Sequence, residues 1–138
     1  MSIEVVSQRH KVEKAVEKAM KEAATMIGGS LSGHASEQAP ADTGLLRNSI
    51  TYALGGEPPA IAQYTDDAGE QTGVYEGSAP KDEKNEITVY IGTNVEYATY
   101  QELGAPSIKL PARPFLRPAV ENNQREIEQI LEQCFRNL

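Results

Sequence analysis

The feature that most constrains this chain is a helical hydrophobic pattern in its first 40 residues. Apolar side chains recur at spacings of three and four: Val12, Val16, Met20, Ala23 and Ile27. This spacing is typical of one helix face packed on a core, and lysine and glutamate occupy the other side. Because the residue before a proline is disfavoured in the α conformation, we expect a long amphipathic helix that ends before Pro40.

Three glycines interrupt this pattern halfway along. Gly28, Gly29 and Gly33 each destabilise a helix interior by about 1 kcal/mol relative to alanine. The pattern resumes only weakly from residue 35 to residue 39. We therefore predict a helix with a kink or a frayed centre.

Two segments show the alternation of half-buried strands, at residues 49–54 and 87–92. The segment between them, residues 55–85, is rich in glycine and proline. A structureless loop of that length is uncommon in a compact domain. We interpret the segment as a long hairpin excursion with weak strands at 60–64 and 72–75 and a mobile tip. The alternative is a wholly mobile arm.

The C-terminal third predicts two more helices. Asn94 is suited to cap a short helix through Leu103, with Gly104 as its left-handed terminator. The prolines that follow favour an extended loop over residues 105–114. A final helix should begin near Pro118. Its apolar stripe is Val120, Ile127, Ile130, Leu131, Cys134 and Leu138.

The order of these elements predicts a single α+β domain over residues 1–138. We expect a long N-terminal helix, an antiparallel sheet with the hairpin excursion, a short helix, and a C-terminal helix packed on the sheet.

The charge of the chain is concentrated in one segment. Of the net −7, residues 55–85 contribute −5, from seven carboxylates and two lysines. Acidic surfaces are repelled by phosphate and anionic lipid, so we predict no specific nucleic-acid binding and no membrane docking. The chain has no apolar run of about 18 residues and no apolar signal-peptide core. Cys134 is the only cysteine, so the predicted compartment is a reducing cytoplasm.

Residues with catalytic potential do not form a recognisable motif. His10 and His34 lack partners at metal-ligand spacing, and Cys134 lies on an apolar helix face without a nearby histidine. Asp66 and Asp67 are adjacent, so they point in opposite directions along an extended chain. We predict no catalytic residue, metal or cofactor. A small hydrolase or a regulatory binding module remains the distant alternative.

Arg113 and Arg117 flank Phe115 and Leu116. One interpretation is that the two apolar residues fill the core while the arginines cover it. The other is an interface anchor, because aromatic and arginine side chains are enriched at binding hot spots. Both interpretations stay open.

Two blocks of the sequence resemble the HK97 gp10-like family of tailed-phage proteins. The first, residues 40–50, reads PADTGLLRNSI and is similar to the family block AP-x-DTG-x-L-R-x-SI. The second joins YATYQELG at residues 97–104 to PARPFLRPA at residues 111–119. It looks like the family's YA-x-x-x-E-x-G turn followed by PFLRPA. The blocks, in this order, cover most of residues 10–135.

The resemblance implies a head–tail joining or tail-completion protein of a phage or prophage. Such proteins form rings, commonly hexamers, between the head connector or adaptor and the tail tube or tail terminator. The implied location is the virion neck or tail, and the bacterial host cytoplasm during assembly. A tail terminator or a minor capsid component is the alternative in the same setting.

The resemblance also implies roles for single residues. Structural roles fall to the turn-forming and motif positions: Pro40, Thr43, Gly44, Ser49, Tyr97, Glu102, Gly104, Pro114 and Pro118. Interface roles fall to Arg113, Phe115, Leu116 and Arg117. If the acidic segment lines the bore of a ring, its like charge would let DNA pass without binding. The predicted channel-facing acids are Glu57, Asp66, Asp67, Glu70 and Glu76.

Overall fold

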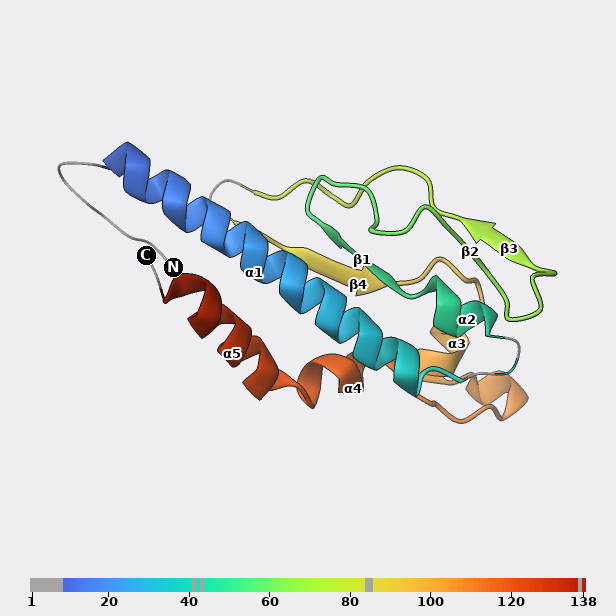
Figure 1. Ribbon diagram of the computed structural model, residues 1–138. Coiled ribbons are helices and arrows are strands. Elements are labelled where there is room, and N and C mark those ends of the chain that lie inside the picture. Colours follow the sequence, from blue (N-terminus) through green and yellow to red (C-terminus); the bar gives the residue numbers. More distant parts are fainter. Residues whose placement is uncertain (1–8, 41, 43, 84–85, 137) are drawn as a thin grey trace.

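A 30-residue helix, α1 (Arg9–Gln38), is the element around which the others pack (Figure 1). The computed structural model describes residues 9–40, 42, 44–83, 86–136 and 138. The remaining elements follow in order: α2 (Leu45–Ser49), β1 (Thr51–Leu54), β2 (Gln63–Thr65), β3 (Thr72–Val74), β4 (Val89–Gly92), α3 (Ala98–Leu103), the 3₁₀ turn η1 (Pro106–Ile108), α4 (Leu116–Glu121) and α5 (Gln124–Phe135). The predicted α+β class is confirmed.

The expected kink in α1 is wrong, because the helix runs unbroken through its glycines. The reason is a close contact with the sheet. A Cβ atom at Gly28 would lie 2.5 Å from the ring of Tyr52 on β1 and 2.9 Å from a methyl of Val89 on β4. Only glycine lets the strands approach the helix backbone this closely, and the packing offsets the helix propensity that glycine loses.

The strands form two antiparallel pairs rather than one sheet. β1 pairs with β4, with Thr51 opposite Gly92 and Leu54 opposite Val89, and both strands contact α1. β2 pairs with β3 to form a hairpin that contacts α2. This β2–β3 hairpin is the predicted excursion, and its two strands lie within the expected weak segments.

Two tyrosines fix the hairpin to the rest of the fold. The Tyr75 hydroxyl donates to the Ser49 carbonyl at 2.5 Å, and the Tyr64 hydroxyl donates to Asn94 Oδ1 at 2.5 Å. Burial raises the pKa of both hydroxyls above the ordinary 10.0, so they remain protonated donors. Asn94 Nδ2 in turn donates to the Val74 carbonyl at 2.9 Å. The alternative of a mobile arm is therefore wrong.

The C-terminal third departs from the sequence prediction at three points. Asn94 serves the hairpin, and α3 begins at Ala98 with Tyr97 before it. The expected loop at residues 105–114 contains η1 and a bridge between Ala105 and Leu110. The single final helix is two, α4 and α5, because Asn123 folds back to donate its side-chain amide to the Ala119 carbonyl at 2.7 Å.

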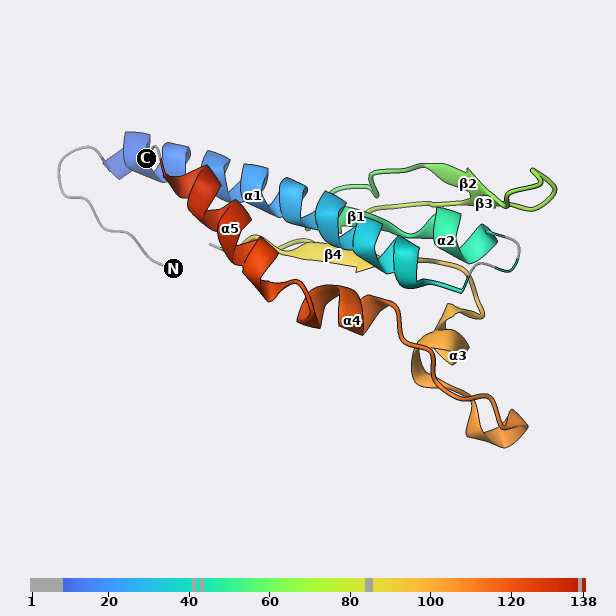
Figure 2. The ribbon, with the colours of Figure 1, turned by 60° about the horizontal axis from the view of Figure 1, so that its bottom comes forward.

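The C-terminal helices pack mainly on α1, and α1 in turn contacts the sheet (Figure 2). The largest contact of α5 is with α1, so the helix expected on the sheet lies along α1 instead. The short β1–β4 pair has its helix-facing side already occupied by α1. None of the described helices has the length and apolar character of a membrane span.

The core lies where the end of α1 meets α2, α3 and α4. Its fully buried centre is the Phe115 ring, surrounded by small side chains such as Ala35 and Ala119 and by Leu46. Small residues on the two helices bring their backbones close to the ring. This cluster joins the two family-like blocks, since Leu46 belongs to the first and Phe115 to the second.

The glycines of α1 give a matched test of this packing. We expect Gly28→Ala to lower the free energy of unfolding by about 1–3 kcal/mol, because the new methyl overlaps the Tyr52 ring. Gly33→Ala should raise it by about 1 kcal/mol, because nothing lies within 4 Å of that position. Urea titration measures both. Equal stabilisation by the two substitutions would contradict the close contact.

Candidate assembly surface

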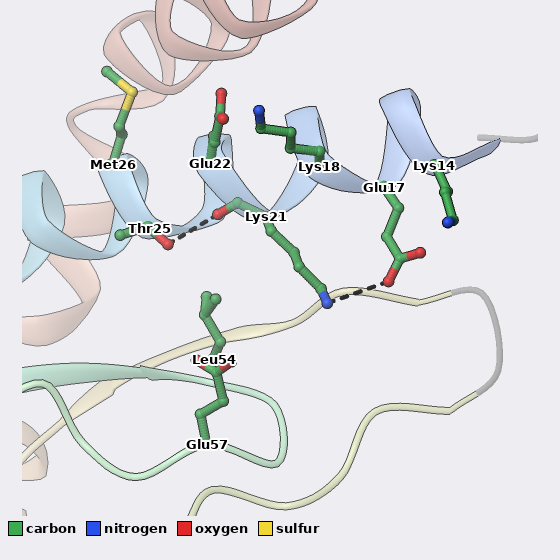
Figure 3. A pocket seen from close by; sticks show the side chains of 9 residues that line it. All are labelled: Lys14, Glu17, Lys18, Lys21, Glu22, Thr25, Met26, Leu54 and Glu57. Carbon is green, nitrogen blue, oxygen red and sulfur yellow. Dashed lines mark hydrogen bonds and ion pairs between the residues drawn. The ribbon is translucent and has the colours of Figure 1, made fainter. Parts of the chain in front are cut away.

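An open groove between α1 and the turn after β1 is the most prominent hollow described (Figure 3). Its lining is Lys14, Glu17, Lys18, Lys21, Glu22, Thr25, Met26, Leu54 and Glu57. Lys21 pairs with Glu17 at 3.2 Å, and both side chains are more than half exposed. Exposed pairs of this kind contribute little and leave no desolvated reactive group. The groove therefore has the character of a solvated surface.

A serine, a histidine and a glutamate meet between α1 and α5, but not in the order that nucleophilic catalysis needs. Glu126 accepts a hydrogen bond from Ser30 at 2.5 Å and contacts His34 Nε2 at 2.7 Å. A catalytic serine would instead contact the histidine, which would take its proton. Hydrogen bonds from Ser30 and then His34 lower the pKa of Glu126. The arrangement fastens the two helices, and it gives His34 a packing role.

Metal ligands do not gather elsewhere in the described part of the chain, where no group of three or more His, Cys, Asp or Glu is close enough to hold an ion. Cys134 lies against α1, with its Sγ 3.6 Å from the Met26 Sδ. His10 is on the first turn of α1, and its side chain lies outside the described residues.

The first family-like block closes the end of α1. Gly44 has φ 81°, and a Cβ there would lie 2.3 Å from the Asp67 carboxyl, so both conformation and space require glycine. Arg47 donates from Nε to the Ser36 carbonyl at 3.0 Å and from its terminal nitrogen to the Ala39 carbonyl at 3.5 Å. A cation at the C-terminal end of a helix is favourable. Thr43 lies outside the described residues.

Ser49, the buried serine of the same block, connects three segments. Its hydroxyl donates to the Leu46 carbonyl at 2.6 Å and lies 2.6 Å from the Thr93 hydroxyl. Its own carbonyl accepts the Tyr75 hydroxyl. Because the side chain is fully buried, removing the hydroxyl would leave these groups without partners. The structural role predicted for Ser49 agrees with these contacts.

In the second block, Glu102 joins α3 to the start of α4. Its carboxylate accepts backbone N–H groups from Phe115 at 2.7 Å, Leu116 at 3.0 Å and Arg117 at 2.9 Å. Partial burial alone would raise the pKa of Glu102, but the three hydrogen bonds and the Arg117 charge outweigh it and lower the pKa. This long-range link explains why the glutamate precedes PFLRPA in the block.

Gly104 allows the loop after α3 to fold back. It has φ 78°, and a Cβ would lie 2.9 Å from the Ala112 nitrogen. The Tyr97 carbonyl, at the other end of α3, accepts the N–H groups of Tyr100 and Gln101 at 3.1 and 3.3 Å. These positions have the structural roles that the resemblance implies.

The predicted interface residues divide into buried and exposed positions. Phe115 is 0% exposed, so it is a core residue and offers no surface to a partner. Leu116 is half-buried against the same cluster. Arg113 and Arg117 are exposed. The packing interpretation therefore applies to Phe115, and the interface interpretation stays a prediction for the two arginines.

The three prolines named by the resemblance border helices. Pro40 follows the end of α1, and Pro114 directly precedes Phe115. Pro118 is the third residue of α4, where the first turn needs no backbone donor.

One of the predicted channel-facing acids is buried. Asp66 is 7% exposed and accepts the Glu70 N–H at 2.8 Å, which holds the turn between β2 and β3. A channel-facing role for Asp66 is therefore wrong. Asp67 is exposed and bonds to Asn48 on α2 at 3.1 Å.

The other three predicted channel acids, Glu57, Glu70 and Glu76, are exposed. Their channel role, with that of Asp67, stays a prediction.

The surface that sequence reasoning missed is a projection at residues 97–110, formed by α3 and η1 (Figure 2). This α3–η1 projection exposes four large apolar side chains: Tyr97, Tyr100, Leu103 and Ile108. Leu103 is 69% exposed and Ile108 is 71% exposed. Exposed apolar groups concentrated in one place mark interaction sites, whereas scattered ones do not. The apolar spacing at 97, 100 and 103 was the available signal.

The family is decided by a comparison with protein-family models. The model HK97-gp10_like, described as "Bacteriophage HK97-gp10, putative tail-component", matches residues 2–104. The chain belongs to this family. It is accordingly a phage structural protein of the tail-component class, and its place is in the virion. The match includes the first block and reaches Gly104 of the second, so it covers Glu102 but ends before PFLRPA.

One curated relative shows how widely such sequences occur. "Uncharacterized protein MJ0331" of Methanocaldococcus jannaschii is 32% identical over 72 residues, which are 47% of this chain and 53% of the relative. The chain thus spans about half the length of that relative. No solved structure matches the chain.

The Glu102 link predicts a large effect for a small change. Glu102→Gln removes the charge and one acceptor oxygen, leaving backbone donors at the start of α4 poorly satisfied. We expect the free energy of unfolding to fall by roughly 1–3 kcal/mol in urea titration. Glu96→Gln, at an exposed glutamate before α3, should change it by less than about 0.5 kcal/mol. Equal effects would contradict the link.

The lowered pKa values of Glu102 and Glu126 predict a pH dependence. Between the folded pKa and the ordinary 4.5, the unfolded chain binds more protons than the folded one. The stabilisation is therefore complete above about pH 4.5 and is lost as the pH falls through the folded pKa. Urea titrations from about pH 6 to pH 3 should show this loss. In Glu102→Gln the slope should be shallower, and an unchanged slope would contradict it.

Proposed function

We propose that this protein joins the head connector of a tailed phage or prophage to its tail, by assembling into a ring of identical copies. The family match supports a tail component, and the head–tail position and the ring are the finer steps of the proposal. Within this proposal the ring is a hexamer, and its neighbours are the connector or adaptor and the tail tube or terminator. Subunits are made and assembled in the host cytoplasm.

The observation that carries the proposal is the division between internal and external residues. The family-like blocks form internal links: Arg47 to α1, Ser49 to the hairpin and Glu102 to α4. They hold a rigid frame, and that frame presents the exposed apolar α3–η1 projection. A frame of this kind supports binding to other chains, because rigid surfaces lose little entropy on association.

A phage lacking this gene tests the position. We expect electron microscopy to show filled heads beside separate tails of normal length, and a plasmid copy should restore joined particles. Overlong tails would instead identify a tail terminator, and defective heads a minor capsid component. Intact, infectious virions without the protein would overturn the proposal.

A further inference from the structure

We propose that the α3–η1 projection of one copy docks on the outward face of the β2–β3 hairpin of a second copy. The inference rests on the proposed ring and names the surfaces that would form it. It assigns Tyr100, Leu103 and Ile108 to one side of the contact and Val74 to the other.

The hairpin has distinct inner and outer faces. Its inner face carries Tyr64, whose ring lies over Gly73, where a Cβ would be 2.2 Å from the ring. Val74, the next residue, points to the opposite face, because neighbouring strand residues alternate. It is 55% exposed. Leu103 and Ile108 on the projection are still more exposed, so each surface has apolar area to bury.

The charges of the two surfaces are opposite. Residues 61–80 contain four carboxylates and no lysine or arginine, and Glu70 and Glu76 are exposed. Residues 97–117 contain Lys109, Arg113 and Arg117 against one carboxylate, Glu102, which is already bonded to three backbone donors. In a chain of net charge −7, most pairings between copies are repulsive. The projection against the hairpin is a pairing with complementary charge.

The two surfaces are placed so that copies can join head to tail. Both lie at the same end of the molecule, on opposite sides (Figures 1 and 2). A contact between two different patches is heterologous, and it generates a ring when the rotation between copies closes. Both surfaces are also held in place, the hairpin by Tyr64 and Tyr75 and the projection by the Ala105–Leu110 bridge.

This assignment changes the expectation for the acidic segment. Glu70 and Glu76 would contact a neighbouring subunit instead of facing a DNA channel. Only Glu57 and Asp67 remain as predicted channel-facing acids, and both are exposed.

Disulfide trapping tests the contact directly. In a Cys134→Ser background, Ile108→Cys and Val74→Cys are prepared as two separately tagged populations. After mixing and mild oxidation, we expect disulfides mainly between the two populations, and at least about tenfold fewer within either one. A majority of links within the Ile108→Cys population would show a symmetric contact and overturn the proposal.

Charge reversal provides the second test, by sedimentation analysis of self-association. Lys109→Glu with Arg113→Glu should weaken association at least about tenfold, and so should Glu70→Lys with Glu76→Lys. A mixture of the two double variants should recover association. Lys18→Glu, at an exposed lysine on α1, is the control and should have no effect. Circular dichroism checks that each variant is folded.

The outcomes separate the two proposals. Association that survives both charge reversals overturns the docking assignment and leaves the ring in place. A wild-type chain that stays monomeric at high concentration, while its gene deletion still separates heads from tails, overturns contact between copies and leaves the head–tail position. Normal virions after deletion overturn the proposed function itself.

Discussion

The rest of the structure depends on the burial of α1 on two opposite sides. One side meets the sheet at Gly28, where the missing side chain admits the ring of Tyr52. Ser30 lies about 200° around the helix from Gly28, and with His34 it binds Glu126 of α5. A helix covered on both sides can organise a small domain whose strands have only three or four residues. Two-stranded pairs of that length are marginal alone.

Polar links then connect the elements that α1 does not bind itself. The Glu102 carboxylate fixes α4 relative to α3, and the Tyr75 and Tyr64 hydroxyls fix the β2–β3 hairpin. Each of these bonds joins residues that are at least 13 positions apart in the sequence. They stabilise because the groups are partly buried, where a hydrogen bond that is not made is expensive. The outer surfaces of the hairpin and of the projection are consequently held still, which favours assembly with other chains.

This design accounts for what the two family-like blocks do. Their polar and glycine residues have roles inside the subunit, and Phe115 fills its core. Family membership therefore reports a shared frame more than a shared interface. The exposed apolar residues at 100, 103 and 108 lie largely at unspecified positions of the blocks or between them. Different members can thus keep the frame and vary the surface that meets their neighbours.

The sequence by itself determined the α+β class, the position of most helices and strands, and the family. These follow from local periodicity, from proline and glycine chemistry and from motif spacing, which act over a few neighbouring residues. It did not determine that α1 stays straight through its glycines, that Asn94 binds the hairpin, or that Asp66 is buried. Nor did it separate buried Phe115 from exposed Arg113 and Arg117. Only the tertiary structure decided these points, because each depends on a contact between residues distant in sequence, whose packing outweighs the local preference.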